Sequence, residues 1–410
     1  MNIWNNISTR LKKIEQPDED LIRIPRVNNH IHTPYSFSAF DSIDNIIEAA
    51  KKENISVLGI NDFNTPGGFP EWAEKCFNNN IFPIFNIEMI GLNKADMKNG
   101  LRINDPHNPG RVYISGKALA YPLKLSDWHA GRLKLIRDLS NDHVYRMTLK
   151  INDILGTVND RLIVDFDEML RDHTMGMVRE RHLAGMVRIN IEKIYREEKE
   201  IKDVYTRLLG EDIEPAGIND KAYLENIIRS RLLKAGGEAF VKEDPEVFIE
   251  SQDIRDIILD AGGIPAYPFL ADFKDGMYTE FEYDREQAAL RLAEGGFHSV
   301  EFIPARNNYQ LFKEYVMFLY DKGFIITFGT EHNAPGEKPL GVFADGNKKL
   351  DNDLLRINYE GACILAAHQY LYATTGAGYL DKKGKPQKNK KEKFVKLGDR
   401  LIKLVNKGLY

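Results

Sequence analysis

Short apolar runs alternate with helical segments in two separate stretches of this chain. The strand-like runs are residues 27–32, 57–63, 81–92 and 111–119 in the first stretch, and residues 263–268, 299–304 and 325–330 in the second. Apolar strands separated by helices of about ten residues are typical of a parallel sheet that is covered on both faces. The pattern therefore predicts one α/β barrel of seven strands, assembled from two blocks of sequence.

The segment between the two blocks is of a different kind. It is dense in charged residues and in Leu, Ile and Met at helical spacing, as in the stripe of Leu183, Val187, Ile191 and Ile194. A structureless loop of this length inside a compact domain would be unusual. We therefore predict a helical insertion that covers the mouth of the barrel.

Five parts of the chain follow from this pattern. They are an N-terminal helical segment (1–25), the first half of the barrel (26–122), the helical insertion (123–250), the second half of the barrel (251–345) and a C-terminal helical extension with a lysine-rich linker (346–410). In the extension, residues 352–375 are mostly apolar and residues 394–406 have one apolar face. Both stretches predict helices that dock onto the barrel.

Composition excludes several classes of partner. The net charge of −5 offers no basic surface for nucleic acid. The first residues lack the features of a signal peptide, and no apolar run approaches the roughly 18 residues of a membrane span. The two cysteines, Cys76 and Cys363, indicate buried thiols and no disulfide framework. We expect a cytoplasmic protein whose partner is a small molecule, with no role for nucleic acid or membrane.

Two histidines, His30 and His32, stand at the end of the first predicted strand. Alternate side chains of a strand share one face, so both imidazoles point the same way. A pair of imidazoles at this spacing supplies half of a metal site. By itself the pair is weak evidence, so the other strand ends must supply the remaining ligands.

Several polar residues stand where the other apolar runs stop, at the end of a barrel where active sites are found. They are Asp62, Glu88, Tyr113, Tyr267, Arg306, Glu331 and His332. Glu88 lies within the apolar run 84–90, and a carboxylate is costly to bury unless a cation lies nearby. A metal ion would supply that cation.

Five short motifs in this order resemble those of the PHP domain, the polymerase and histidinol phosphatase superfamily. They are residues 30–36 (HIHTPYS), 59–65 (GINDFNT), 87–88 (IE), 262–268 (GGIPAYP) and 329–332 (GTEH). The resemblance covers both barrel blocks and leaves the insertion and the C-terminal extension unexplained. It implies a distorted seven-stranded (β/α) barrel and a metal-dependent hydrolase.

The resemblance also implies a ligand set. Members of this superfamily commonly bind three metal ions. One ion is held by the two histidines of the first motif, a glutamate after the third strand and an aspartate after the last strand. The counterparts in this chain are His30, His32, Glu88 and Glu331, the last with a longer carboxylate.

The ligands of the other two ions are replaced. The two histidine positions of the second ion correspond to Tyr113 and Tyr267. The three ligand positions of the third ion correspond to Phe37, Phe63 and either Asn333 or, with a gap of one residue, His332. The ligand set of the first ion has a complete set of counterparts, whereas the ligands of the other two ions are replaced together. The resemblance therefore implies a site for one divalent ion. Two imidazoles and two carboxylates suit Zn²⁺, Mn²⁺ or Fe²⁺ and do not choose among them.

The remaining strand-end residues have alternative roles. Asp62 is a general base, a carboxylate that orients a histidine, or the cap of a turn. His332 is a ligand or handles a proton, and Tyr267 either fills the volume of a lost metal or donates a proton. Arg306 is placed to grip an anionic substrate unless it is a surface residue. His182 shares a helix face with apolar residues and is expected to pack.

Three functions remain open. The first is a phosphoesterase-like hydrolase that uses a metal-activated water on a small anionic substrate. The second is a one-metal enzyme of amidohydrolase or isomerase type that acts on a carbonyl or sugar substrate. The third is a metal-binding protein without catalytic activity.

Overall fold

Seven strands form one sheet, and each strand pairs with its neighbour along the chain. They are β1 (Arg26–Ile31), β2 (Ile55–Phe63), β3 (Phe82–Leu92), β4 (Arg111–Lys117), β5 (Ile264–Pro268), β6 (Ser299–Phe302) and β7 (Ile325–Phe328). A bridge between Ile31 and Glu331 joins the first strand to the segment after the last, so the sheet nearly closes into a barrel. The predicted seven-stranded α/β barrel is confirmed.

The computed structural model describes residues 3–12, 24–214, 217–243, 248–271, 278–332, 339–381 and 383–410. Asn333 lies outside the described residues, as does most of the predicted N-terminal segment. Within that segment the structure describes one helix, α1 (Ile3–Leu11).

One strand runs against the predicted direction. β4 is antiparallel to both β3 and β5, whereas the other neighbouring pairs are parallel. Only a short helix, α4 (Lys94–Lys98), and a loop connect β3 to β4, and a parallel crossover needs a longer connection. The expectation of a wholly parallel sheet is therefore wrong at β4, which begins at the mouth of the barrel and ends at its base.

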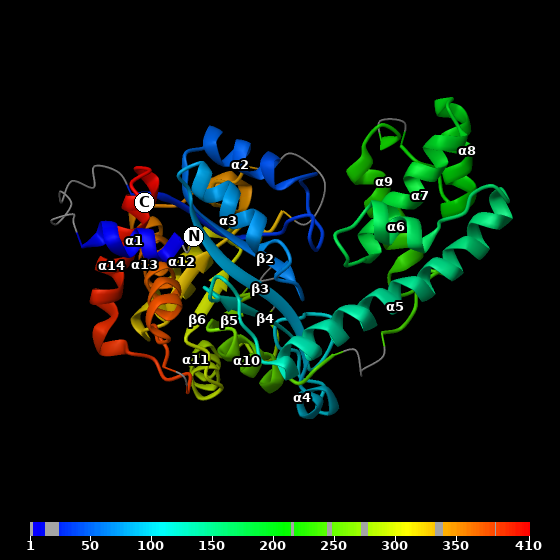
Figure 1. Cartoon of the computed structure of the whole chain (residues 1–410). Coiled ribbons are helices and arrows are strands. Elements are labelled where there is room, and N and C mark those ends of the chain that lie inside the picture. The colour runs from blue at the N-terminus through cyan, green and yellow to red at the C-terminus, as the bar shows by residue number, and fades with distance from the viewer. Residues whose placement is uncertain are drawn as a thin grey trace.

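Helices of both blocks cover the outside of the barrel (Figure 1). They are α2 (Ile43–Lys52), α3 (Phe69–Asn78), α10 (Ser251–Asp260), α11 (Arg285–Glu294) and α12 (Tyr309–Asp321), joined by α13 (Asn352–Thr375) and α14 (Lys391–Asn406) of the C-terminal extension. α13 packs where the first and last strands meet. The side chain of Asn358 accepts a hydrogen bond from the backbone of Phe328 and donates one to Val27. Most of this helix is buried, which explains its apolar sequence.

The insertion is a separate lobe at the far end of α5 (Figure 1). Its helices are α5 (Asp127–Val158), α6 (Phe166–Asp172), α7 (Glu180–Ile194), α8 (Glu198–Leu209) and α9 (Lys221–Ile228), followed by a π-helical turn at Arg229–Leu233. Leu183, Val187 and Ile191 of the predicted stripe lie in a hydrophobic core that belongs to this lobe alone.

α5 links the lobe to the barrel. Its first turn is tied to the end of α10 by hydrogen bonds from Ser126 and His129 to the carboxylate of Asp260. A helix of 32 residues spans about 48 Å, enough to carry the chain from the base of the barrel past its mouth. A small cluster of Phe37, Phe63 and Met177 makes a second contact between lobe and barrel.

Two further predictions concern single features. Cys76 and Cys363 are both buried and unpaired. Within the described ranges, no helix combines the length and the apolar character that a membrane crossing requires.

A short hairpin of β8 (Phe343–Ala344) and β9 (Lys348–Lys349) follows the barrel.

Candidate metal centre and its cavity

The interior of the barrel is polar at the level of the first motif. The side chains of His30 (β1), Asn61 (β2), Ser115 (β4) and Glu301 (β6) contact one another across the barrel, although their strands are not all neighbours. Glu88 of β3 pairs in register with Ser115, so its side chain points to the same interior. Strand alternation thus brings residues from far apart in the chain into one buried layer.

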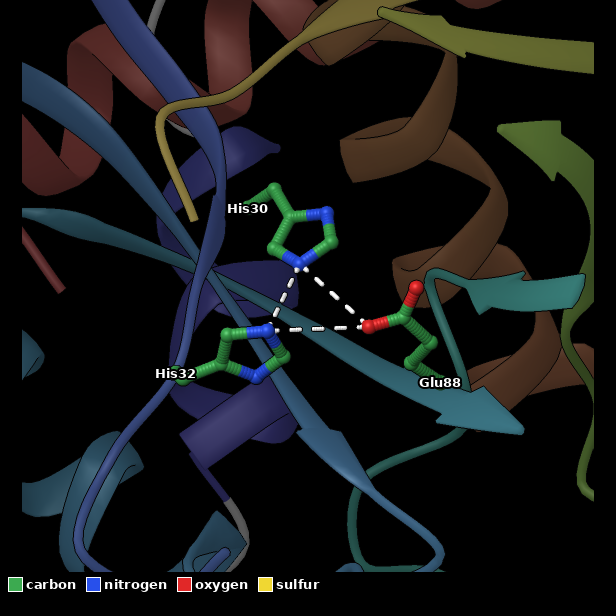
Figure 2. Close-up of side chains that lie close together, drawn as sticks. All are labelled: His30, His32 and Glu88. Carbon is green, nitrogen blue, oxygen red and sulfur yellow. Dashed lines mark hydrogen bonds and ion pairs between the residues drawn. The ribbon is translucent and has the colours of Figure 1, made fainter. Parts of the chain in front are cut away.

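His30, His32 and Glu88 converge on a single point (Figure 2). The Nε2 atoms of the two histidines lie 3.3 Å apart, and each lies 3.6 Å from Oε2 of Glu88. The circle through three atoms at these separations has a radius of about 2.0 Å, which is the usual distance from a zinc ion to nitrogen or oxygen ligands.

The surroundings of these atoms also fit a cation. All three side chains are buried, and Oε2 of Glu88 has no hydrogen-bond partner within the described structure. A buried carboxylate oxygen without a partner is costly. Burial raises the pKa of Glu88 to about 8, and burial together with the nearby His30 holds the pKa of His32 well below its usual value. A neutral imidazole is the form that binds metals, and a divalent ion would favour the ionised carboxylate.

Glu301 and Lys117 complete this layer, although the strand-end pattern of the sequence predicts neither as a site residue. Oε2 of Glu301 lies 3.1 Å from Nδ1 of His30, on the side of the ring away from Glu88. The other oxygen, Oε1, forms a short ion pair with the buried ammonium group of Lys117. Burial raises the pKa of Glu301, but Lys117 and His30 outweigh this effect and hold it at about 2. An ionised carboxylate at Nδ1 fixes the orientation of the imidazole, so that Nε2 faces His32 and Glu88, with the side-chain amide nitrogen of Asn61 also 3.1 Å away.

The fourth predicted ligand, Glu331, lies apart from the three. Its carboxylate lines the same cavity but forms an ion pair with Arg306, at 2.5 Å. Glu331 and His332 both have positive φ angles, 63° and 55°, which is unusual for residues with side chains. The cluster that could hold a metal thus contains three of the four predicted ligands among the residues that the structure describes.

A cavity of about 630 Å³ opens above these residues. Its inner end is lined by His30, His32, Glu88 and Glu301 from the barrel. Its outer side, which we call the insertion wall, is formed by Arg179, Glu180, Arg181, Arg229 and Lys234. Arg306 and Glu331 stand between the two. The insertion therefore contributes five of the residues that line the cavity, and the barrel contributes the candidate metal ligands.

Comparison with protein families gives a match over the first half of the barrel and most of the insertion. Residues 28–212 match the family model of the PHP domain. The predicted resemblance to the PHP domain is confirmed. A comparison with curated proteins gives no match.

Two solved structures share the fold of this chain. One is a "putative metal-dependent phosphoesterase" from Bifidobacterium adolescentis, with 16% identity, a TM-score of 0.51, and coverage of 83% of this chain and 96% of that one. The other is an amidohydrolase from Chromobacterium violaceum with bound sulfate and no metal, with 15% identity, a TM-score of 0.51, and coverage of 81% and 96%. At such low identity the likeness establishes the fold alone.

Aromatic rings occupy the positions where the PHP resemblance implies further metal ligands. Phe37 and Phe63 pack on the ring of His32, with centroids 4.8 and 5.2 Å away, and Tyr113 lies against Phe63 at 6.2 Å. These three residues line the cavity beside the histidines. They fill the space with apolar surface, and Phe37 and Phe63 hold the His32 ring in place.

Asp62 faces away from the cavity. Its neighbours in the strand, Asn61 and Phe63, point inward, so alternation turns Asp62 outward. Its carboxylate accepts hydrogen bonds from the backbone and hydroxyl of Thr33, at 2.7 and 2.5 Å, and from Ser36, at 2.6 Å. Burial nevertheless raises its pKa to about 7. The role of general base is therefore wrong, and Asp62 instead holds the turn that follows His32.

Tyr267 also points away from the cavity, although it was predicted as a site residue. Alternation in β5 directs Ala266 to the interior, opposite Ser115, and turns Tyr267 to the outer face. Its hydroxyl donates to Glu282 at 2.8 Å, and its ring packs among Phe269, Phe281 and Phe297. A phenol in this position fills space under the outer helices and cannot reach a metal-bound water.

His332 and His182 have structural contacts. Nδ1 of His332 lies 2.7 Å from the hydroxyl of Thr330, and its ring packs on Phe40. Its side chain is not among those that line the cavity, so the predicted role in proton transfer is corrected. His182 accepts a hydrogen bond from the backbone of Arg179 at the start of α7, and burial lowers its pKa to about 4.

Proposed function

We propose that this protein is a hydrolase that uses one divalent metal ion, Zn²⁺, Mn²⁺ or Fe²⁺, to cleave a phosphoester in a small anionic substrate. The observation that carries the proposal is the convergence of two imidazole nitrogens and an unpartnered carboxylate oxygen at the inner end of a large cavity. The name of the Bifidobacterium structure supports a phosphoester, and the sulfate in the Chromobacterium structure indicates that a related fold accepts a tetrahedral anion.

The residues have separate tasks in this proposal. His30, His32 and Glu88 hold the ion, and the carboxylate of Glu331 lies in the same cavity. When bound, such an ion polarises the substrate and lowers the pKa of a water molecule to roughly 7. Glu301 keeps the His30 ring in place through Nδ1. Arg306 offers its guanidinium to an anionic oxygen of the substrate, in exchange for its ion pair with Glu331.

A carbonyl substrate is the second candidate, because the other solved structure is an amidohydrolase. Metal-activated water attacks carbonyl carbon and phosphorus alike. The two candidates share the metal ligands and differ in the bond that is broken. Turnover of phosphoesters against amides and lactones separates them.

The metal can be tested before any substrate is known. The wild-type protein, stripped with chelator, reloaded and desalted, should retain about one equivalent of transition metal by elemental analysis. His30→Ala and Glu88→Ala should each lose most of it, because three ligands are reduced to two. The matched controls His173→Ala and Glu392→Ala change exposed residues of the same types and should retain it. Full metal content in His30→Ala, or three equivalents in the wild type, would contradict the one-ion site.

Activity is tested with the reloaded enzyme. Release of phosphate from glycerol 3-phosphate should follow metal content across these four variants. Hydrolysis of amides or lactones without any phosphate release would overturn the phosphoester proposal and leave the metal site standing.

A further inference from the structure

Two arginines of the insertion wall, Arg179 and Arg181, form no ion pair with the residues that the structure describes. In the part of the chain that the structure describes, no ion pair joins either guanidinium to a carboxylate, and Nε of Arg179 is buried without a hydrogen-bond partner. Half-buried guanidinium groups are normally paired, because removing a charge from water is costly. Both side chains line the cavity that contains the metal cluster.

The acidic residue between them is already engaged. Glu180 binds Nη2 of Arg229 at 2.9 Å and Nζ of Lys234 at 2.8 Å. The insertion wall therefore has four cationic side chains and one carboxylate that is shared by two of them. Crowding is visible in Arg181, where burial and the charge of Arg229 lower the pKa to about 10. Glu180 also attracts Arg179 and Arg181 at longer range, but its ion pairs are with Arg229 and Lys234, so the insertion wall keeps an excess of positive charge.

Aromatic rings of the barrel support these two guanidiniums. The Cζ atom of Arg179 lies 5.2 Å from the ring centre of Phe63 and 5.9 Å from that of Phe37, and Cζ of Arg181 lies 5.7 Å from the Phe37 ring. A ring face attracts a cation without using its N–H donors. The planar donor groups are thus held near the cavity and remain available to a ligand.

The distance to the metal cluster suits a small molecule. The Phe63 ring lies 5.2 Å from the His32 ring and 5.2 Å from Cζ of Arg179, so the guanidinium carbon lies at most about 10 Å from the centre of the His32 ring. One compact substrate can therefore reach both the metal ligands and the arginines. Guanidinium groups bind phosphate and carboxylate through paired hydrogen bonds.

We propose that Arg179 and Arg181 form a second anion-binding subsite, which selects phosphoesters that carry a further phosphate or carboxylate group. The scissile phosphate lies at the metal and Arg306, and the second anionic group lies at the insertion wall. The inference rests on the proposed function for the first group only. Binding of the second group needs neither the metal nor hydrolysis.

Three matched substrates test the subsite. Glycerol 3-phosphate has one anionic group, 3-phosphoglycerate adds a carboxylate, and glycerol 1,3-bisphosphate adds a phosphate. The wild-type enzyme should have a higher kcat/KM for at least one of the last two than for the first. In Arg179→Ala and Arg181→Ala this preference should fall by about ten- to a hundred-fold, the usual effect of losing a charge-assisted hydrogen bond. If the preference for 3-phosphoglycerate falls more, the natural second group is a carboxylate; if the preference for glycerol 1,3-bisphosphate falls more, it is a phosphate.

The controls separate charge from geometry. Arg179→Lys and Arg181→Lys keep the charge but lose the paired donors, so they should recover only part of the preference. Arg161→Ala removes an exposed arginine of the same lobe and should leave the preference unchanged. Equal losses for all three substrates in the alanine variants, or no loss, would overturn the subsite.

A binding measurement distinguishes failure of the subsite from failure of the proposed function. Calorimetry with metal-free protein should detect 3-phosphoglycerate or glycerol 1,3-bisphosphate in the wild type and a weaker signal in Arg179→Ala/Arg181→Ala. If this difference is present but no phosphoester is hydrolysed, the phosphoester proposal fails and the anion subsite stands. If metal-dependent hydrolysis is present but binding is equal in the two proteins, the subsite fails alone.

Discussion

Replacement of Glu301 by glutamine should damage stability and metal affinity by two different routes. Glutamine keeps the size of the side chain but removes the charge that faces Lys117, which is fully buried. The remaining polar neighbours of the ammonium group, the carbonyl oxygen of Asn29 and Oδ1 of Asn61, are neutral and lie 3.4 Å away. Breaking a buried ion pair typically costs about 3–5 kcal/mol. Burial already lowers the pKa of Lys117, so the unpaired ammonium group can release its proton and avoid part of this cost. We therefore expect the free energy of unfolding to fall by about 3 kcal/mol, the lower end of this range.

The second route acts through His30. Without a carboxylate at Nδ1, the imidazole loses its fixed orientation, and loss of such a partner commonly weakens metal binding about 10- to 100-fold. The double variant Glu301→Gln/Lys117→Met removes the unpaired ammonium group and should regain most of the lost stability. It should not regain metal affinity, because His30 still lacks its carboxylate.

Two assays read the two routes separately. Urea unfolding of the metal-free proteins at pH 7 gives the free energy of unfolding, and competition with a chromophoric zinc chelator gives the metal affinity. Recovery of both quantities in the double variant would show that Glu301 acts only as the partner of Lys117. Unchanged metal affinity in the single variant would refute the orienting role directly.

Two further predictions test the geometry around the metal cluster. The pKa of Asp62 is about 7 in the folded protein and near 3.8 when unfolded, so between these values the folded state retains a proton that the unfolded state has lost. The free energy of unfolding therefore falls as the pH rises from about 4 to 7, by at most about 4 kcal/mol. Asp62→Asn cannot ionise, so its urea midpoint should fall less than that of the wild type between pH 5 and 7.5, whereas parallel profiles of the two proteins would contradict the raised pKa. Gly329 lies against His30, where an added Cβ would be 2.8 Å from the His30 backbone nitrogen and closer still to its Cβ. Gly329→Ala should therefore lower both the melting temperature and the metal content, while Gly131→Ala, which meets no atom within 4 Å, should keep both; normal metal content in Gly329→Ala would show that His30 can move without harm.

The fold was largely predictable because apolar periodicity marks strands and helices. All seven barrel strands and the long helix α13 lie where the sequence pattern places them. The direction of β4 was not predictable in this way, since a short apolar run looks the same in either direction. Only the length of its connection to β3 indicates the reversal.

The candidate site was predictable only in part. His30, His32 and Glu88 could be found because strand ends collect functional residues and a buried carboxylate needs a cation. The same argument applies to Glu301, which stands between Val300 and Phe302 in an apolar strand, and it would have found this residue too. Lys117 ends its strand at the base of the barrel, where a search of strand ends at the mouth does not look.

Asp62 and Tyr267 were assigned wrongly for one physical reason. Each is a single position out of step with the residues that face the interior, and a shift of one residue moves a side chain to the other face of a sheet. Sequence spacing alone cannot set that phase. One cross-barrel contact, such as the 3.1 Å hydrogen bond from Ser115 to Glu301, fixes it for every strand in the sheet.

The separate hydrophobic core of the insertion has a consequence for how such proteins diversify. Residues of this lobe pack mainly on one another. They contact the barrel through α5, the cluster of Phe37, Phe63 and Met177, the two arginines on the same rings, and the ion pair of Arg111 with Glu243, so most of the lobe can change its sequence without disturbing the strands. If the barrel supplies the proposed hydrolytic site, exchanging the lobe would alter the choice of molecule and leave the metal ligands in place. A chimaera with another lobe grafted between the start of α5 and the start of α10 would be the natural starting point for changing the molecule that the cavity accepts.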